Sequence, residues 1–261
     1  MRMYIQICSY AKDVGWCRYA LRSIKKYARG FSGVRLVVPA GDFQLFSRIG
    51  SGVSLCPIKQ IGYPLRGDKP KLHYLIQQCR ADEHCSEADF ILHMDSDCVF
   101  TERVTPEDYL VQDRPVLLRE KFEIVKTYFP GRCTWQPLAE KALGFPVPYD
   151  TMVRHPSVHH RWLYREVRER IEHVQGVPFD EYVFAQSEQP LGFTEYPILG
   201  AYALQFHADK YAWFEAKSPH KPFDSEKAVG VKEKMRQFQS RNGHGRSELA
   251  KVEAELRRIV G

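Results

Sequence analysis

Strand and helix patterns alternate through the first hundred residues, and this alternation restricts the fold more than any other feature of the sequence. Apolar runs predict strands at residues 4–9, 34–38, 53–58 and 90–94, and amphipathic spacing predicts helices at 14–28, 42–49 and 70–81. Strands that are separated by helices form parallel sheets with right-handed crossovers. We therefore expect an α/β fold whose doubly wound, mostly parallel sheet is covered by helices on both faces.

The second half of the chain is less regular. Its patterns predict a strand at 115–119, loops across 128–157, a helix at 157–175, and a loop and strand around 190–206. A last helix is predicted from Leu249, Val252, Leu256 and Ile259, a stripe that would dock on the same domain or on a second subunit. We expect one domain over residues 1–225, with halves at 1–100 and 101–225, and a basic helical tail at 226–261.

Two carboxylates stand at the end of the fourth predicted strand, in "DFILHMDSDCVF". Asp95 and Asp97 follow an apolar run that is typical of a strand buried on both faces. Two like charges this close repel each other and lose hydration unless a positive charge lies nearby. Open α/β sheets bind ligands at the carboxyl ends of their strands, and a divalent cation is a common partner for such a pair. The alternative is that both residues only cap the following turn.

The composition is that of a globular chain, with 44% apolar and 27% charged residues. No stretch approaches the roughly 20 apolar residues of a membrane span. The first residues indicate a strand and not a signal peptide, so we expect a cytoplasmic protein. Seven cysteines without a paired Cys-x-x-Cys spacing favour reduced thiols over a zinc site or disulfides.

Positive charge is concentrated at the end of the chain. The net charge is +6, and residues 226–261 hold nine Lys/Arg against five Asp/Glu. Such a tail fits an anionic partner, and it also fits an ordinary solvated helix.

Three segments, "LHMDSDCVF", "MVRHPSV" and "FTEYPILGAYA", occur in this order. Together with the strand order, they resemble the GT-A class of sugar-nucleotide-dependent glycosyltransferases, and within it a poorly characterised bacterial and phage group. The resemblance covers about residues 3–225. It implies a Rossmann-type GT-A fold in which residues 1–100 bind nucleotide and metal and residues 101–225 bind the acceptor.

The resemblance also implies a metal-dependent reaction. Asp95 and Asp97 would hold Mn²⁺ or Mg²⁺ against the diphosphate of a nucleoside-diphosphate sugar, with a UDP-sugar as the expected donor. His220 in "SPHKPFD" would be a third metal ligand, and His207 is the alternative for this role. Lys221 would contact the same phosphates.

Further donor contacts follow from the same resemblance. Ser9 and Tyr10, in the turn after the first strand, would touch the nucleotide, and Tyr10 would stack on the base. Arg66 and Lys71 lie just ahead of the strand that carries the Asp pair, where similar enzymes bind nucleotide or diphosphate.

Glu195 is the expected catalytic residue. It is a lone acid among Phe193, Tyr196 and Pro197, a setting that raises the pKa of a carboxyl group toward that of a useful base. Inverting members of the class place a carboxylate in this region, although many read Glu-Asp where this chain reads Glu-Tyr. Inversion with Glu195 as the base is the favoured hypothesis. Retention, with Glu195 orienting a substrate, and a structural capping role stay open.

Two other functions compete with glycosyl transfer. A sugar-nucleotide nucleotidyltransferase shares the fold, but it usually carries a glycine- and basic-rich signature where this chain reads "SYAKDVGWCRYA". A non-enzymatic polyanion-binding module would use the basic tail without metal or nucleotide. For the enzyme, the acceptor classes are a glycan, a lipid-linked saccharide met by peripheral membrane contact, or a hydroxymethylated DNA base. The sequence does not indicate an oligomeric state.

Overall fold

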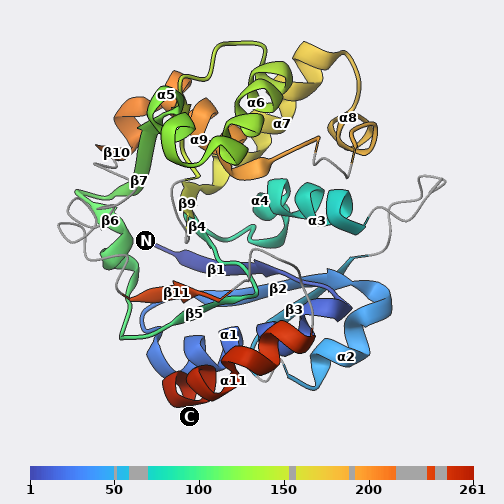
Figure 1. Ribbon diagram of the computed structural model, residues 1–261, viewed down its shortest axis with the longest axis vertical. Coiled ribbons are helices and arrows are strands. Elements are labelled where there is room, and N and C mark those ends of the chain that lie inside the picture. Colours follow the sequence, from blue (N-terminus) through green and yellow to red (C-terminus); the bar gives the residue numbers. More distant parts are fainter. Residues whose placement is uncertain (50–51, 59–69, 153–156, 188–191, 216–233, 239–245) are drawn as a thin grey trace.

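The computed structural model describes residues 1–49, 52–58, 70–152, 157–187, 192–215, 234–238 and 246–261. Its centre is a mixed, mostly parallel five-stranded sheet (Figure 1). The strand order is β3 (Ser54–Ile58), β2 (Gly33–Pro39), β1 (Met3–Cys8), β4 (Phe90–His93) and β9 (Ser157–His160). The first four strands are parallel, and β9 runs antiparallel to β4. The α/β architecture and the four early strands are as predicted.

Alternate residues of β1 face opposite sides of the sheet, as the two-residue period of a strand requires. Met3, Ile5 and Ile7 pack in a core cluster with helix α1 (Val14–Tyr27). On the other face, the Gln6 side-chain amide donates to the Gln77 carbonyl at 3.3 Å. Helices therefore cover both faces of the sheet.

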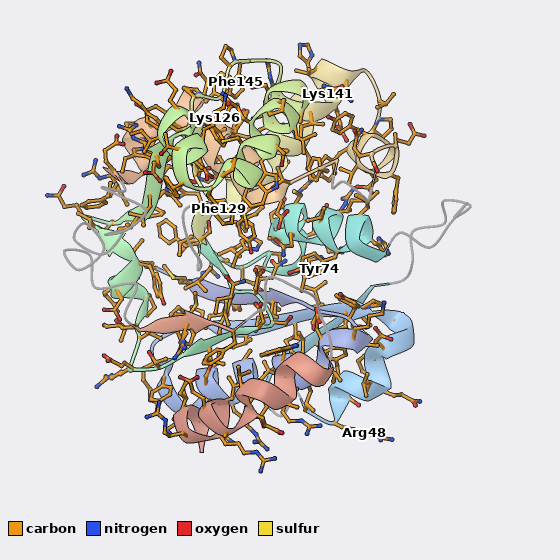
Figure 2. All side chains as sticks on the ribbon, in the orientation of Figure 1. Arg48, Tyr74, Lys126, Phe129, Lys141 and Phe145 are labelled. Atoms are coloured by element: carbon orange, nitrogen blue, oxygen red, sulfur yellow. The ribbon has the colours of Figure 1, made fainter. Side chains whose placement is uncertain are left out.

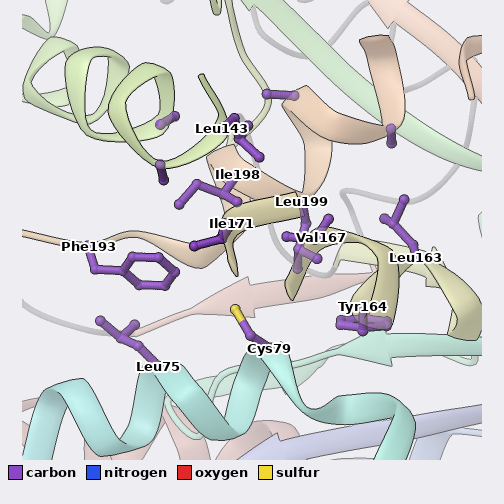
Figure 3. Close-up of a cluster of buried hydrophobic side chains, with 14 of the residues drawn as sticks. Leu75, Cys79, Leu143, Leu163, Tyr164, Val167, Ile171, Phe193, Ile198 and Leu199 are labelled. Carbon is purple, nitrogen blue, oxygen red and sulfur yellow. The ribbon is translucent and has the colours of Figure 1, made fainter. Parts of the chain in front are cut away.

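The larger core lies on the second face of the sheet and between the helices above it (Figure 3). Leu75, Leu143 and Ile171 are among its buried side chains. The helices that build it are α3 (Pro70–Cys79), α4 (Ala81–His84), α6 (Trp135–Leu143), α7 (Arg161–Gln175), α8 (Phe179–Phe184) and α9 (Glu195–Phe206).

Smaller strands complete the fold. β10 (Ala212–Glu215), β7 (Arg114–Lys121) and β6 (Leu110–Val111) form one sheet, and β8 (Tyr149–Asp150) pairs with β7. β5 (Cys98–Phe100) pairs with β11 (Met235–Gln237). The other helical segments are α2 (Phe43–Ser47), α5 (Phe122–Tyr128) and the 3₁₀ turns η1 (Ala11–Asp13), η2 (Ala40–Asp42), η3 (Pro106–Tyr109), η4 (Pro130–Thr134) and η5 (Ala208–Lys210).

The end of the chain folds back onto its beginning. Helix α11 (Arg246–Val260) buries Leu256 and Val260 in a cluster with Trp16 and Tyr19 of α1. The predicted helix is confirmed, and of the two docking partners left open by the sequence, its apolar stripe packs on its own domain. The strand β11 within the tail was not predicted.

The predicted strand around residues 190–206 is wrong, because the segment from Glu195 to Phe206 is helix α9. Nearly all of its first seven residues are buried, and a helix that is apolar on all sides shows no amphipathic period. Pro197 lies in its first turn, where the missing N–H has no helical partner to lose.

Other boundaries also differ from the prediction. The segment 128–157 is not only loop, because it contains α6 and β8. The predicted helix at 157–175 starts at Arg161, after strand β9, and β10 was not predicted.

Gly200 explains how closely α9 packs against the chain beside β8. A Cβ atom at this position would lie 2.1 Å from the Thr151 hydroxyl oxygen. Only glycine permits this approach, and it sets the position of the first turns of α9.

No helix in the described part of the chain is long and apolar enough to cross a membrane. All seven cysteines are free thiols.

Candidate functional site

The Asp pair lies at the edge of the sheet where β1 and β4 both end. The two strands are parallel neighbours, with Gln6 opposite His93, so the residues that follow them emerge on the same side. Ser9 and Tyr10 follow β1, and Asp95 and Asp97 follow β4. The structure therefore brings the predicted nucleotide turn and the predicted metal pair to one edge of the sheet.

Asp95 accepts hydrogen bonds from two tyrosines of different helices. The hydroxyl groups of Tyr74 in α3 and Tyr196 in α9 each donate to Asp95 Oδ1 at 3.2 Å (Tyr74 is labelled in Figure 2). Burial, followed by the charge of Asp95, raises the pKa of both phenols well above its usual value. Both groups therefore stay protonated at neutral pH and act as donors.

Asp97 is buried, with 8% of its surface exposed. Burial, and then the neighbouring charge of Asp95, raise its pKa from 3.8 to about 7. The side-chain amide of Gln237 in β11 lies 3.4 Å from both carboxylate oxygens, and the Phe238 N–H donates to the Asp97 carbonyl at 3.1 Å. Sequence analysis missed Gln237, because nothing in the local sequence links it to a residue 140 positions earlier.

The chemistry of this pair fits a divalent cation. Asp97 is buried and Asp95 is half-buried, and the charge of Asp95 disfavours that of Asp97, so a cation between the two would stabilise the charge of both. Within the described residues, no group of three or more His, Cys, Asp or Glu side chains is arranged to hold a metal ion. Mg²⁺ commonly binds through one or two carboxylates, with substrate phosphates and water completing the shell, and this pair suits that arrangement.

Glu195 is the first residue of α9 and is 6% exposed. Its negative charge is one of the causes that raise the pKa of Cys8 and of Tyr74, after burial. Glu195 therefore lies near the end of β1 and near the tyrosine that contacts Asp95. The N-terminus of a helix stabilises a negative charge of this kind.

The turn after β1 contains a carboxylate that sequence analysis did not select. Ser9 is buried and its N–H donates to the Val37 carbonyl at 2.9 Å. Tyr10 is half-buried, and burial together with the charge of Asp13 raises its pKa to about 12. Asp13 is also buried, and its charge contributes to the raised pKa of Asp97. The only sequence signal for Asp13 is an acid in the short segment between the first strand and the first helix.

Of the remaining predicted site residues, His207 is the one whose side chain the structure describes, and it lies away from the Asp pair. His207 follows the last residue of α9, about 18 Å along the helix from Glu195. Its Nε2 atom lies 2.7 Å from Glu166 Oε2. Arg66, His220 and Lys221 lie outside the described residues, and Lys71 belongs to the first turn of α3 with its side chain outside them.

Comparison with protein-family models gave no match, and no curated protein matched the chain.

Replacing Asp97 by Asn should change how stability depends on pH. The native pKa of about 7 exceeds the usual 3.8, so the native state binds the proton more tightly than the unfolded chain. The free energy of unfolding of the wild type therefore falls as the pH rises through this interval, and Asp97→Asn removes that loss. Without divalent cations, we expect the variant to be more stable than wild type by about 2–4 kcal/mol near pH 8. Near pH 4 the difference should be small. Urea titrations of wild type and variant near pH 4 and near pH 8 measure the two differences in the free energy of unfolding. A difference that is the same at both pH values contradicts the raised pKa of Asp97.

A double-mutant cycle should detect the bond between Tyr196 and Asp95. We expect Tyr196→Phe to lower the free energy of unfolding by about 1.5–3 kcal/mol in the wild type, because a hydrogen bond to a charged group is lost. The same substitution should cost much less in the Asp95→Asn background. Tyr164→Phe is the matched control, since no described residue hydrogen-bonds the buried Tyr164 hydroxyl. Equal losses in both backgrounds contradict the coupling.

Proposed function

We propose that this chain is a metal-dependent glycosyltransferase of the GT-A type. It transfers a sugar from a nucleoside-diphosphate sugar, with a UDP-sugar as the expected donor, to an acceptor hydroxyl. The observation that carries the proposal is the pair of half-buried Asp95 and buried Asp97 at the carboxyl edge of a mostly parallel sheet, with Glu195 nearby. Open α/β sheets bind their ligands at this edge.

In this proposal, the residues at the edge of the sheet hold the donor. Asp95 and Asp97 would hold Mn²⁺ or Mg²⁺, which would supply positive charge against the diphosphate that leaves. Tyr74 and Tyr196 keep Asp95 in place. Tyr10 follows β1 at the same edge, where its half-buried ring would stack on the nucleotide base of the donor.

Glu195 is proposed as the general base. Its carboxylate takes the proton of the acceptor hydroxyl while the acceptor oxygen forms a bond to the sugar and the bond from the sugar to the diphosphate breaks. A single displacement of this kind inverts the configuration of the sugar. If Glu195 instead orients a substrate, the reaction proceeds with retention, and the anomeric configuration of the product distinguishes the two.

Binding of the donor should depend on the Asp pair. We expect Mn²⁺ together with one nucleoside diphosphate or its sugar to raise the melting temperature of the wild type, because a ligand that binds only the native state stabilises it. EDTA should abolish the shift, and so should Asp97→Ala. Asp209→Asn, at a carboxylate that is fully exposed, is the matched control and should keep the shift.

The same screen tests the competing functions. A folded wild type that responds to no nucleotide with Mn²⁺ contradicts the proposal and favours a polyanion-binding module. Formation of a sugar nucleotide and pyrophosphate from a nucleoside triphosphate and a sugar 1-phosphate favours a nucleotidyltransferase.

Replacing Glu195 by Gln should separate binding from catalysis. We expect the variant to keep the Mn²⁺-dependent donor shift and to lose turnover by about 10²–10⁴-fold, the usual contribution of a general base. Hydrolysis of the sugar nucleotide to the free sugar and the nucleoside diphosphate provides an assay before the acceptor is identified. Glu169→Gln, on the surface of α7, is the control. Turnover close to wild type in Glu195→Gln excludes the base role.

A further inference from the structure

Helix α1 presents a row of positive charges to solvent. Its exposed residues are Arg18, Arg22, Lys25 and Lys26, and the helix contains no acidic residue. In the described part of the chain, no carboxylate forms an ion pair with any of these four side chains. Arg18 to Lys26 spans about 12 Å of helix. The row is therefore a cationic surface with no acidic partner on its own helix.

The neighbouring helix α11 compensates this row only in part. Lys26 Nζ donates to the Ile259 carbonyl at 2.7 Å, and the charge of Arg18 acts on Glu253, which is itself paired with Arg257. Arg22 and Lys25 have no carboxylate partner among the described side chains.

Helix α2 also carries exposed apolar side chains. Phe43 and Leu45 are 40% and 39% exposed, while Phe46 anchors the same helix in the core. Arg48 follows the helix and is exposed (Figure 2). Phe43 and Leu45 are therefore available for an apolar contact outside the core.

The two helices share one face of the sheet. Strands β1, β2 and β3 are parallel and follow each other in one direction, so right-handed crossovers place α1 and α2 on the same side. Figure 1 shows α1, α2 and α11 together on one side of the molecule, with α5, α6 and α7 on the opposite side. We call the surface formed by Arg18, Arg22, Lys25, Lys26, Phe43, Leu45 and Arg48 the basic face.

We propose that the basic face binds the surface of an anionic lipid membrane. Its cations would contact lipid phosphates, and Phe43 and Leu45 would enter the boundary between head groups and acyl chains. A nucleic acid would satisfy the cations equally well, but its phosphate backbone offers nothing to the aliphatic side chain of Leu45. The combination of exposed cations with an exposed apolar pair therefore favours lipid.

Docking by this face would bring the candidate site close to the membrane. Both α1 and α2 are preceded by turns at the carboxyl edge of the sheet, and the Ala11 N–H donates to Asp42 Oδ2 between these turns at 2.8 Å. An acceptor carried by a lipid would then approach the same edge. Only this last consequence depends on the proposed function; membrane binding itself does not.

Vesicle sedimentation tests the inference on the full chain. Wild type should sediment with vesicles of phosphatidylcholine and phosphatidylglycerol, and not with phosphatidylcholine alone. Arg18→Gln/Arg22→Gln/Lys25→Gln should weaken partitioning by about a hundredfold, since each basic residue near an anionic surface contributes a factor of about five. Phe43→Ser/Leu45→Ser should weaken it independently of salt, whereas the cationic contribution should fall as salt is added.

Matched controls come from the opposite side of the molecule. Lys126→Gln/Lys141→Gln removes exposed cations there, and Ile124→Ser/Phe129→Ser removes side chains that are 46% and 37% exposed (Lys126, Phe129 and Lys141 are labelled in Figure 2). Both controls should sediment like wild type.

The outcomes separate this inference from the proposed reaction. Unchanged partitioning of both basic-face variants, loss of partitioning in the controls, or binding to duplex DNA but not to vesicles would each overturn it. The Mn²⁺-dependent donor shift should stay intact in the basic-face variants, which also shows that they are folded. Failure of that shift in wild type would count against the glycosyltransferase and not against the membrane surface.

Discussion

The hydrogen bonds from Tyr74 and Tyr196 to Asp95 join the two halves of the molecule at the candidate site. Tyr74 comes from α3, which follows the third strand, and Tyr196 comes from α9, more than a hundred residues later. The carboxylate of Asp95 is half-buried, and the loss of hydration is unfavourable without such partners. Because Glu195 directly precedes Tyr196, the contact that satisfies Asp95 also positions the proposed base. The position of Glu195 relative to the edge of the sheet that carries Asp95 is thus set by one small group of polar contacts.

The part of the fold that the sequence predicts well is the part that depends on local patterns. Apolar runs such as Phe90–His93 form strands, and the stripe that includes Leu256 forms a helix that docks on α1. The location of Asp95 and Asp97 follows from topology, since parallel strands end at a common edge. These features require only the periods of strands and helices and the handedness of crossovers.

The features that the sequence did not predict depend on distant contacts. Helix α9 is apolar all round because α6, α7 and the sheet surround it, so its period is lost and its apolar run resembles a strand. Strand β9 reads Ser-Val-His-His and carries no strand pattern; pairing with β4 defines it. Gln237 reaches Asp97 only because β11 pairs with β5, and no local feature of the sequence predicts that pairing.

The basic tail expected from the sequence forms ion pairs where its side chains are described. Lys234 pairs with Asp108, Arg236 and Arg258 pair with Glu255, and Arg257 pairs with Glu253. The pair of Lys234 with Asp108 ties the start of β11 to η3, and the pair of Arg236 with Glu255 joins β11 to α11, so these contacts help to place Gln237 beside Asp97. A net charge counts side chains without regard to which of them neutralise each other in the fold. These four cations of the tail therefore attract an anionic partner less than their number in the sequence suggests.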